Sequence, residues 1–169
     1  MKKLALLVVM TVFATTALLS QPHAYVGSAK CAMCHKTDAQ GKQLPIWQAS
    51  KHSKSAAALT SPEAAAKAKE MKLEATSPEC LKCHVPLAEK APEIKAEGVT
   101  CEVCHGPGND YRKLNVMKDR ALAVKNGLVV YETPEAIKKQ CLTCHENAHG
   151  LKFDFAASWE KIKHSKPKA

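Results

Sequence analysis

The eight cysteines of this 169-residue chain all lie in four copies of the unit Cys-x-x-Cys-His. Two thiols at this spacing can bond the two vinyl groups of one porphyrin, and the next residue then points its imidazole at the iron. Each unit is therefore predicted to attach one haem c group and to supply one axial iron ligand. The attachment residues are Cys31, Cys34, Cys80, Cys83, Cys101, Cys104, Cys141 and Cys144, and the proximal ligands are His35, His84, His105 and His145.

Disulfides and structural zinc are the other common uses of paired cysteines. A Cys-x-x-Cys unit closed on itself makes a tight redox loop that does not cross-link a fold. Paired units of this kind can also hold zinc through four thiolates. Neither use explains a histidine at the same offset in all four units. The pattern therefore predicts a multihaem cytochrome c with four haem irons.

Four haems leave little room for a conventional hydrophobic core. Removal of the first 24 residues leaves 145, or about 36 for each haem (145 divided by four). Aromatic residues make up only 5% of the chain, which fits porphyrin faces supplying the flat apolar surface that Phe and Trp supply elsewhere. We therefore predict a mainly α fold, a small helical shell with long loops wrapped around four covalently bound c-type haems.

Residues 1–24 are predicted to be a secretory signal peptide. Two lysines precede an apolar run, Leu4–Leu19, that contains no charge. We place cleavage after Ala24, which leaves residues 25–169 as the mature tetrahaem cytochrome c domain. An uncleaved amino-terminal anchor is the alternative, because Pro22 stands where a smaller residue is more usual. Cleavage predicts a periplasmic protein with no stable membrane insertion.

The net charge of +9 does not indicate nucleic acid as a partner. Loss of the two leader lysines reduces it to +7 (23 basic against 16 acidic side chains), and the propionates of four haems offset this further. The basic stretch Ala64–Lys72 has no interleaved aromatic residues and is interpreted as a solvated helix face. We therefore expect redox partner proteins and no nucleic acid.

Helix-start signals recur along the chain, and no alternating run is long enough to predict a sheet. Most of these signals are a Ser or Thr followed by Pro and Glu, which supply an N-cap, a first-turn proline and a favourable charge. The predicted helices are 44–59, a helix capped by Ser61 that runs to about 75, one opening at 76–79, 111–125, one opening at 133–135 that ends in the fourth unit, and 155–163. A short hairpin around Leu128–Tyr131 is the most β structure that we expect.

Fewer histidines than haems remain for the second, distal axial position. Of the eight histidines, four are proximal ligands and His23 is removed by cleavage after Ala24. The remaining histidines are His52, His149 and His164. At least one haem therefore lacks a distal histidine from its own chain.

The candidates for the distal position differ in strength. His52 and His164 both lie on predicted helices, and we expect each to bind iron. His149 follows His145 by four residues, too close to reach the opposite face of the same haem, so it serves another haem or none. Met117 is a rival, because a thioether sulfur binds haem iron, although packing on a helix is the commoner role of methionine.

Four stretches of the sequence carry a resemblance to a known family. They are Tyr25-Val26-Gly27-Ser28, Trp47-x-x-Ser50-x-His52, Glu97-Gly98-Val99-x-Cys101-Glu102-x-Cys104-His105-Gly106-Pro107-Gly108, and Phe153-Asp154 ahead of His164. Together they are similar to the tetrahaem cytochrome c-554 family over nearly the whole mature chain. The string Cys-Glu-x-Cys-His-Gly-Pro-Gly is the most specific part. The resemblance implies a mainly helical shell around haems that stack in pairs, and electron transfer such as the best-known member performs after hydroxylamine oxidation.

The resemblance also implies an assignment of distal ligands. His52 would cap the haem of the third unit and His164 that of the first, whereas the haem held by His84 would be five-coordinate. The best-known member of the family has a distal histidine several residues after Gly-Pro-Gly for its fourth haem. No histidine occurs here between His105 and His145, so Met117 or His149 would have to take that place.

Electron transport between redox partners in a respiratory chain is the function that we favour, and we favour a carrier over an enzyme. One alternative is a reductase or oxidase that binds nitric oxide, hydroxylamine or nitrite at an open iron beside His84. Such an enzyme needs an acid or base nearby; Glu79, Glu89, Glu93 and Glu102 lie near the units, but each is interpreted first as a solvated acid. Another alternative is a subunit of a conducting filament, and a dimer or oligomer remains open.

Overall fold

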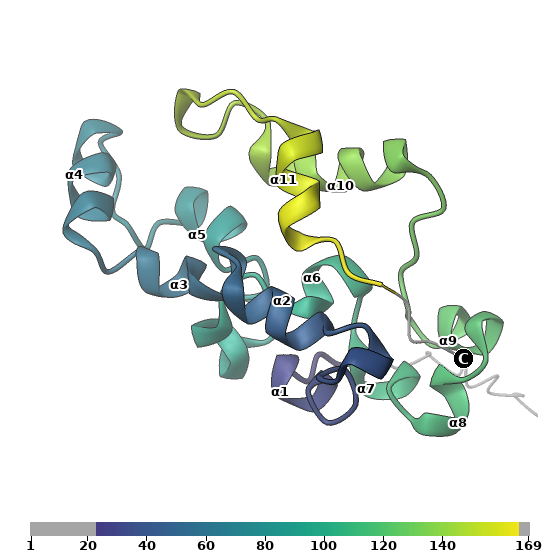
Figure 1. The fold of residues 1–169 in the computed structure, drawn as a ribbon. Coiled ribbons are helices and arrows are strands. Elements are labelled where there is room, and N and C mark those ends of the chain that lie inside the picture. The colour runs from purple at the N-terminus through teal and green to yellow at the C-terminus, as the bar shows by residue number, and fades with distance from the viewer. Residues whose placement is uncertain (1–22, 166–169) are drawn as a thin grey trace, which may run out of the picture.

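A computed structural model describes residues 23–165, and every regular element in this range is a helix (Figure 1). The α-helices are α1 (Ser28–Cys31), α2 (Gln43–Ala49), α3 (Ser55–Ala58), α4 (Pro62–Glu70), α5 (Pro78–His84), α6 (Cys101–His105), α7 (Gly108–Tyr111), α8 (Leu114–Met117), α9 (Arg120–Lys125), α10 (Pro134–His145) and α11 (Phe155–Ile162). The 3-10 turns are η1 (Asp38–Gln40), η2 (His52–Lys54), η3 (Pro92–Glu97) and η4 (Ala148–Gly150). The prediction of a mainly α fold is confirmed.

Helices begin where the capping signals place them. The Ser61 hydroxyl accepts a hydrogen bond from the backbone N–H of Ala64 at the start of α4. The Thr133 hydroxyl does the same for Ala136 at the start of α10, which ends on His145 in the fourth haem unit. In both helices proline takes the first turn, where its missing N–H costs no hydrogen bond. These two predicted starts are confirmed.

Several predicted helix boundaries are wrong, and at Ser50 the cause is a local hydrogen bond. The predicted helix 44–59 is divided at Ser50, whose hydroxyl donates to the Trp47 carbonyl at 2.7 Å and whose backbone is extended. The predicted helix 111–125 is divided into α7, α8 and α9, and α4 ends at Glu70. No strand is present between 128 and 131, so the hairpin expectation is also wrong.

The apolar core of the protein is small. Within residues 23–165, the buried hydrophobic side chains are Ala68, Val85, Leu87, Ala91, Tyr111, Val116 and Ala123. Three of them, Tyr111, Val116 and Ala123, form one cluster with the partly buried Met117 and Leu128. A core of this size fits a fold whose apolar interior is completed by cofactors.

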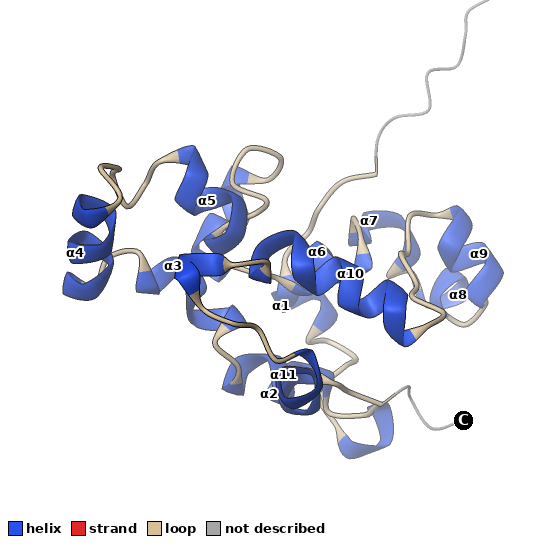
Figure 2. Ribbon diagram, turned by 90° about the horizontal axis from the view of Figure 1, so that it is seen from above, coloured by secondary structure: helices blue, strands red, loops and turns tan. Residues whose placement is uncertain are grey.

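The helices are spread over an irregular shell. Helix α11 packs on α2, although the two lie at opposite ends of the described chain (Figure 2). Helix α4 lies at one end of the molecule and α8 and α9 at the other, with α6 between them (Figures 1 and 2). Among residues 23–165, none of the helices combines the length and apolar character needed to span a bilayer.

Candidate haem-binding sites

Helical backbone presents the two cysteines and the histidine of each unit on one side. The second unit lies within α5, the third is α6 itself and the fourth ends α10. In the first unit α1 ends at Cys31, and the backbone N–H of His35 still donates to the Cys31 carbonyl at 3.0 Å. Residues three and four apart share a helix face. All eight cysteines are free thiols, as covalent attachment requires.

Three of the proximal histidines each face a second histidine from a distant part of the chain. The ring centroids of His52 and His145 lie 6.0 Å apart, and those of His105 and His164 lie 5.7 Å apart. The ring centroids of His84 and His149 lie 6.1 Å apart. The fold therefore brings together the second unit with His149, the third with His164 and the fourth with His52.

These distances fit two imidazoles that share one haem iron. Two metal–nitrogen bonds of about 2 Å place the ligating nitrogens about 4 Å apart, and each ring centre lies about 1 Å behind its nitrogen, which gives centroids about 6 Å apart. Burial lowers the pKa of His52 and His145, and it lowers that of His105 to about 4 with a further contribution from His164. Neutral imidazole is the form that binds a metal.

The proximal ring of His84 is oriented by Ser55. Nδ1 of His84 lies 3.2 Å from the Ser55 carbonyl oxygen, so this nitrogen carries the proton and Nε2 is left for iron. The Ser55 hydroxyl lies 2.7 Å from the His84 carbonyl and 2.8 Å from the His52 carbonyl, and it accepts from the Val99 N–H at 3.0 Å. Ser55 thus ties a proximal ligand of one unit to a predicted distal ligand of another.

The break in the helix at Ser50 positions His52. The Trp47 indole N–H donates to the Val99 carbonyl at 2.8 Å, which fixes α2 beside the third unit. The Ser50 hydroxyl accepts from the His52 N–H at 3.2 Å, and the His52 carbonyl accepts from the Val99 N–H at 3.2 Å. A continuous helix would direct the His52 ring elsewhere, because successive residues rotate by about 100°.

His149 is held in a left-handed backbone conformation. Its φ is 55° and that of Asn147 is 53°. Residues other than glycine adopt this range at a cost of about 1–2 kcal/mol. The turn reverses the chain after α10 and directs the ring toward His84 instead of the neighbouring His145. Backbone strain at a residue with ligand chemistry is typical of a functional position.

Phe153 supports the proximal ring of the fourth unit. Its ring stacks on that of His145 with centroids 4.5 Å apart and an interplanar angle of 10°. One face of the His145 ring is covered by this contact, and the His52 ring lies 6.0 Å away, centroid to centroid, at an interplanar angle of 48°. The residue pair Phe153-Asp154 noted in the sequence therefore has a positioning role, and the Asp154 carboxylate caps α11 through the Ala157 N–H at 3.1 Å.

The buried carboxylate of Glu102 joins the amino-terminal segment to the third unit. Glu102 is only 2% exposed. Its oxygens accept hydrogen bonds from the backbone N–H groups of Val26 (3.0 Å), Gly27 (2.8 Å) and Gly108 (2.6 Å). A Cβ at Gly108 would lie 2.9 Å from Glu102 Oε1, so only glycine lets the backbone approach the carboxylate.

Electrostatic effects between cysteines indicate which of the four units are neighbours in space. A hydrogen bond from the Cys31 thiol lowers the pKa of Cys101 to about 7, and the same contact together with burial raises that of Cys31. Burial and then the neighbouring Cys141 raise the pKa of Cys104 to about 11. Burial and then Cys144 raise the pKa of Cys83. The first unit therefore adjoins the third, the third adjoins the fourth, and the fourth adjoins the second.

Comparison with known proteins agrees with these features. A model of the family described as Cytochrome c554 and c-prime matches residues 30–106, which contain the first three units. Cytochrome c-554 of Nitrosomonas europaea is 30% identical over 145 residues, which cover 75% of this chain. The chain belongs to the cytochrome c-554 family. The match spans 59% of the length of the Nitrosomonas protein. No solved structure matches the chain.

The pairs seen here differ from the distal ligands that the family resemblance implied. His52 faces the fourth unit and not the third, and His164 faces the third unit and not the first. His84, for which an open iron was expected, faces His149. Sequence spacing excluded His149 from the haem of His145 but could not indicate its partner, because that depends on the turn at Asn147.

Two other candidates also have different surroundings from those expected. Met117 packs against the cluster of Tyr111, Val116 and Ala123, the role stated as the alternative to iron ligation. Glu102 is not a solvated acid. Its burial could have been suspected from the glycine-rich string that follows it, since backbone N–H groups freed by a Gly-Pro-Gly turn need acceptors.

Proposed function

We propose that the chain is an exported tetrahaem c-type cytochrome that carries electrons between redox partner proteins. The observation that carries this proposal is the set of three histidine pairs at 5.7–6.1 Å, each containing one proximal histidine. An iron with two imidazole ligands has no position for a substrate, so it exchanges electrons only.

The ligand assignment follows from the pairs. Each Cys-x-x-Cys unit would hold a haem by two thioethers, with His35, His84, His105 and His145 as proximal ligands. His149, His164 and His52 would be the distal ligands of the second, third and fourth haems. When bound, the haems supply the electron-accepting iron. The chain supplies fixed imidazoles, with Ser55 and Phe153 holding two of the proximal rings.

The spatial order of the units supports a single relay. The neighbouring pairs Cys31 with Cys101, Cys104 with Cys141, and Cys83 with Cys144 support the order first, third, fourth, second for the proposed haem attachment points. Electrons would enter near one end unit and leave near the other. The lysines on the surface are then available to balance haem propionates and to meet acidic partners.

The test is a redox titration of the purified holoprotein. We expect a mass that corresponds to four haems per chain, reversible reduction of all four, and predominantly low-spin ferric spectra. Fewer than four haems, or a majority of high-spin irons, would contradict the ligand assignment. A titration in which the haems do not return to the oxidised form would contradict electron carriage itself.

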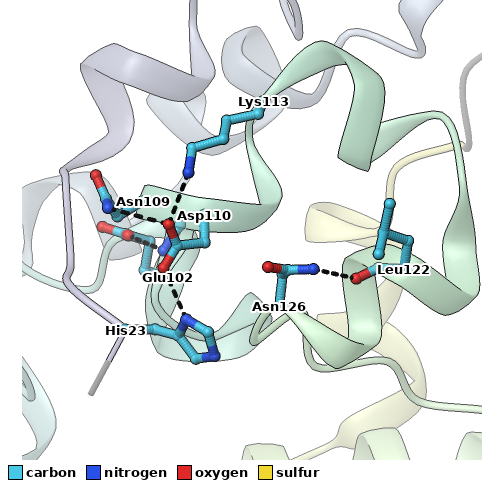
Figure 3. Close-up of polar contacts among 8 residues, drawn as sticks. His23, Glu102, Asn109, Asp110, Lys113, Leu122 and Asn126 are labelled. Carbon is cyan, nitrogen blue, oxygen red and sulfur yellow. Dashed lines mark hydrogen bonds and ion pairs between the residues drawn. The ribbon is translucent and has the colours of Figure 1, made fainter. Parts of the chain in front are cut away.

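The contacts of His23 and Ala24 bear on where the predicted signal peptide is cleaved. His23 Nδ1 lies 2.8 Å from the Asp110 carboxylate (Figure 3). The Ala24 carbonyl accepts a hydrogen bond from the Asn109 N–H at 3.1 Å. Gly127 leaves room for the imidazole, since a Cβ there would lie 3.0 Å from it. His23 and Ala24 thus both contact α7. Cleavage after Ala24 would remove both residues and their contacts.

We expect processing on the amino-terminal side of His23. The measurement is the intact mass of the mature holoprotein after export, with His23 present in it. A mature chain that starts at Tyr25 would show that the contact is not needed.

Ser55→Ala is expected to lower the free energy of unfolding by about 1–2 kcal/mol, because the hydroxyl has two carbonyl neighbours and one N–H donor. It should also shift the electron paramagnetic resonance signal of the haem held by His84. Ser53→Ala is the control, since that hydroxyl contacts only the Gln48 and Ser50 carbonyls nearby. Equal stability of the two variants would show that Ser55 does not link the two units.

A further inference from the structure

The last turn of α6, which contains the third unit, is bound by residues that lead into the fourth unit. A helix leaves its final carbonyl groups without partners inside the helix. In α6 each of the last three carbonyls accepts a hydrogen bond from residues 129–140. The contacts are the Val129 N–H with the His105 carbonyl (2.9 Å), the Tyr131 hydroxyl with the Cys104 carbonyl (3.0 Å), and the Gln140 side-chain amide with the Val103 carbonyl (3.4 Å).

Two of these three donors are side chains at the junction of the third and fourth units. Gln140 directly precedes Cys141 on α10, and its amide reaches the carbonyl of Val103. Tyr131 is half-buried, and burial, followed by the neighbouring Cys104 and Cys141, raises its pKa. Tyr131 and Gln140 therefore join the haem-attachment residues of the third unit to those of the fourth.

Hydrogen bonds to these carbonyls affect a neighbouring redox centre, because a carbonyl oxygen carries a partial negative charge. In the proposed assignment Cys104 attaches the third haem and His105 is its proximal ligand. An oxidised haem iron carries one more positive charge than a reduced one, so negative charge nearby stabilises the oxidised state and lowers the potential. A donor that points at the carbonyl offsets this charge and raises the potential.

The third unit also contains a full negative charge that acts against reduction. The Glu102 carboxylate is only 2% exposed and belongs to the residue after Cys101. Burial weakens the screening of this charge by water, so the carboxylate favours the oxidised state of a haem attached at Cys101. Hydrogen-bond donors at the end of α6 act in the opposite direction.

We propose that Tyr131 and Gln140 are positioning residues that raise the reduction potential of the third haem relative to the fourth. The inference rests on the proposed electron-carrier function and on the ligand assignment made for it. With both donors in place, the third haem remains reducible by the fourth despite the buried carboxylate of Glu102. The two side chains thereby support electron transfer across the middle of the relay.

The test is a redox titration of the four-haem holoprotein followed by electron paramagnetic resonance. The low-spin signal that His164→Ala abolishes reports the third haem, and the signal that His52→Ala abolishes reports the fourth. In Tyr131→Phe the equilibrium constant for electron transfer from the fourth haem to the third should fall about threefold, near the lower end of what one hydrogen bond contributes. Gln140→Leu should lower this constant less, because its hydrogen bond of 3.4 Å is long.

Thr133→Ala is the matched control. The Thr133 hydroxyl caps α10 through the Ala136 N–H, so its loss destabilises the same helix through a hydrogen bond that lies within α10. The equilibrium constant should stay at its wild-type value. A constant that does not fall in Tyr131→Phe, or that falls as much in Thr133→Ala, would overturn the proposal, and one that does not fall in Gln140→Leu would remove Gln140 from it. A failure of electron carriage would appear instead in wild type, as haems that do not reoxidise.

Discussion

His52→Ala is expected to convert one haem of the four from low-spin to high-spin. The imidazole of His52 lies 6.0 Å from that of His145, and no other histidine of the described chain is placed to take over the position. Alanine supplies no ligand, so the iron of the fourth unit would become five-coordinate or bind water. The measurement is the spin count of the ferric holoprotein, with Lys51→Ala as the control because that neighbouring side chain is exposed.

The same experiment determines which haem His52 serves. Phe153 stacks on His145, so Phe153→Leu should perturb the low-spin signal that His52→Ala abolishes. It should leave unchanged the signal that His164→Ala abolishes, because His164 faces His105. If Phe153→Leu instead perturbed the His164-dependent signal, the pairing of His52 with the fourth unit would be wrong.

The local part of the architecture was predictable from sequence. The Cys-x-x-Cys-His units, the caps at Ser61 and Thr133 and the scarcity of apolar core are properties of a few adjacent residues or of composition. The helix break at Ser50 was missed because a serine hydroxyl that bonds to the preceding turn leaves no pattern in hydrophobic periodicity.

The pairing of histidines was not predictable for a different reason. The partners His84 and His149 are separated by most of the second half of the chain, and their meeting depends on left-handed turns at Asn147 and His149. Counting histidines predicted a shortage of distal ligands but could not indicate which histidines lie together. The position of His149 depends on the path of the chain between α10 and α11.

The contacts of Glu102 explain why the string Cys-Glu-x-Cys-His-Gly-Pro-Gly contains a glutamate beside the haem-attachment cysteines. Glu102 is buried by residues that precede it by about 75 positions, since its oxygens accept from the N–H groups of Val26 and Gly27. The carboxylate therefore fixes the segment that leads into the first unit against the third unit. The stretch Tyr25-Val26-Gly27-Ser28 and the glycine-rich string are two halves of one contact.

Glu102→Gln is expected to lower the free energy of unfolding by about 3 kcal/mol. Hydrogen bonds to a charged acceptor are worth about 1.5–3 kcal/mol each, and leaving a buried donor unsatisfied adds to the loss. The glutamine amide offers one acceptor oxygen and one NH₂ group, which would face a backbone N–H at Val26, Gly27 or Gly108. The measurement is guanidinium unfolding of the holoprotein followed by circular dichroism.

The matched control is Glu79→Gln on α5, which also lies in a haem-bearing helix but is exposed. Its effect should be within about 0.5 kcal/mol of wild type, as for most surface substitutions. Gly108→Ala should resemble Glu102→Gln, because its Cβ would displace the carboxylate while the charge is retained. If Glu102→Gln were as stable as the Glu79 control, the hydrogen bonds from the N–H groups of Val26, Gly27 and Gly108 would not hold the first unit to the third.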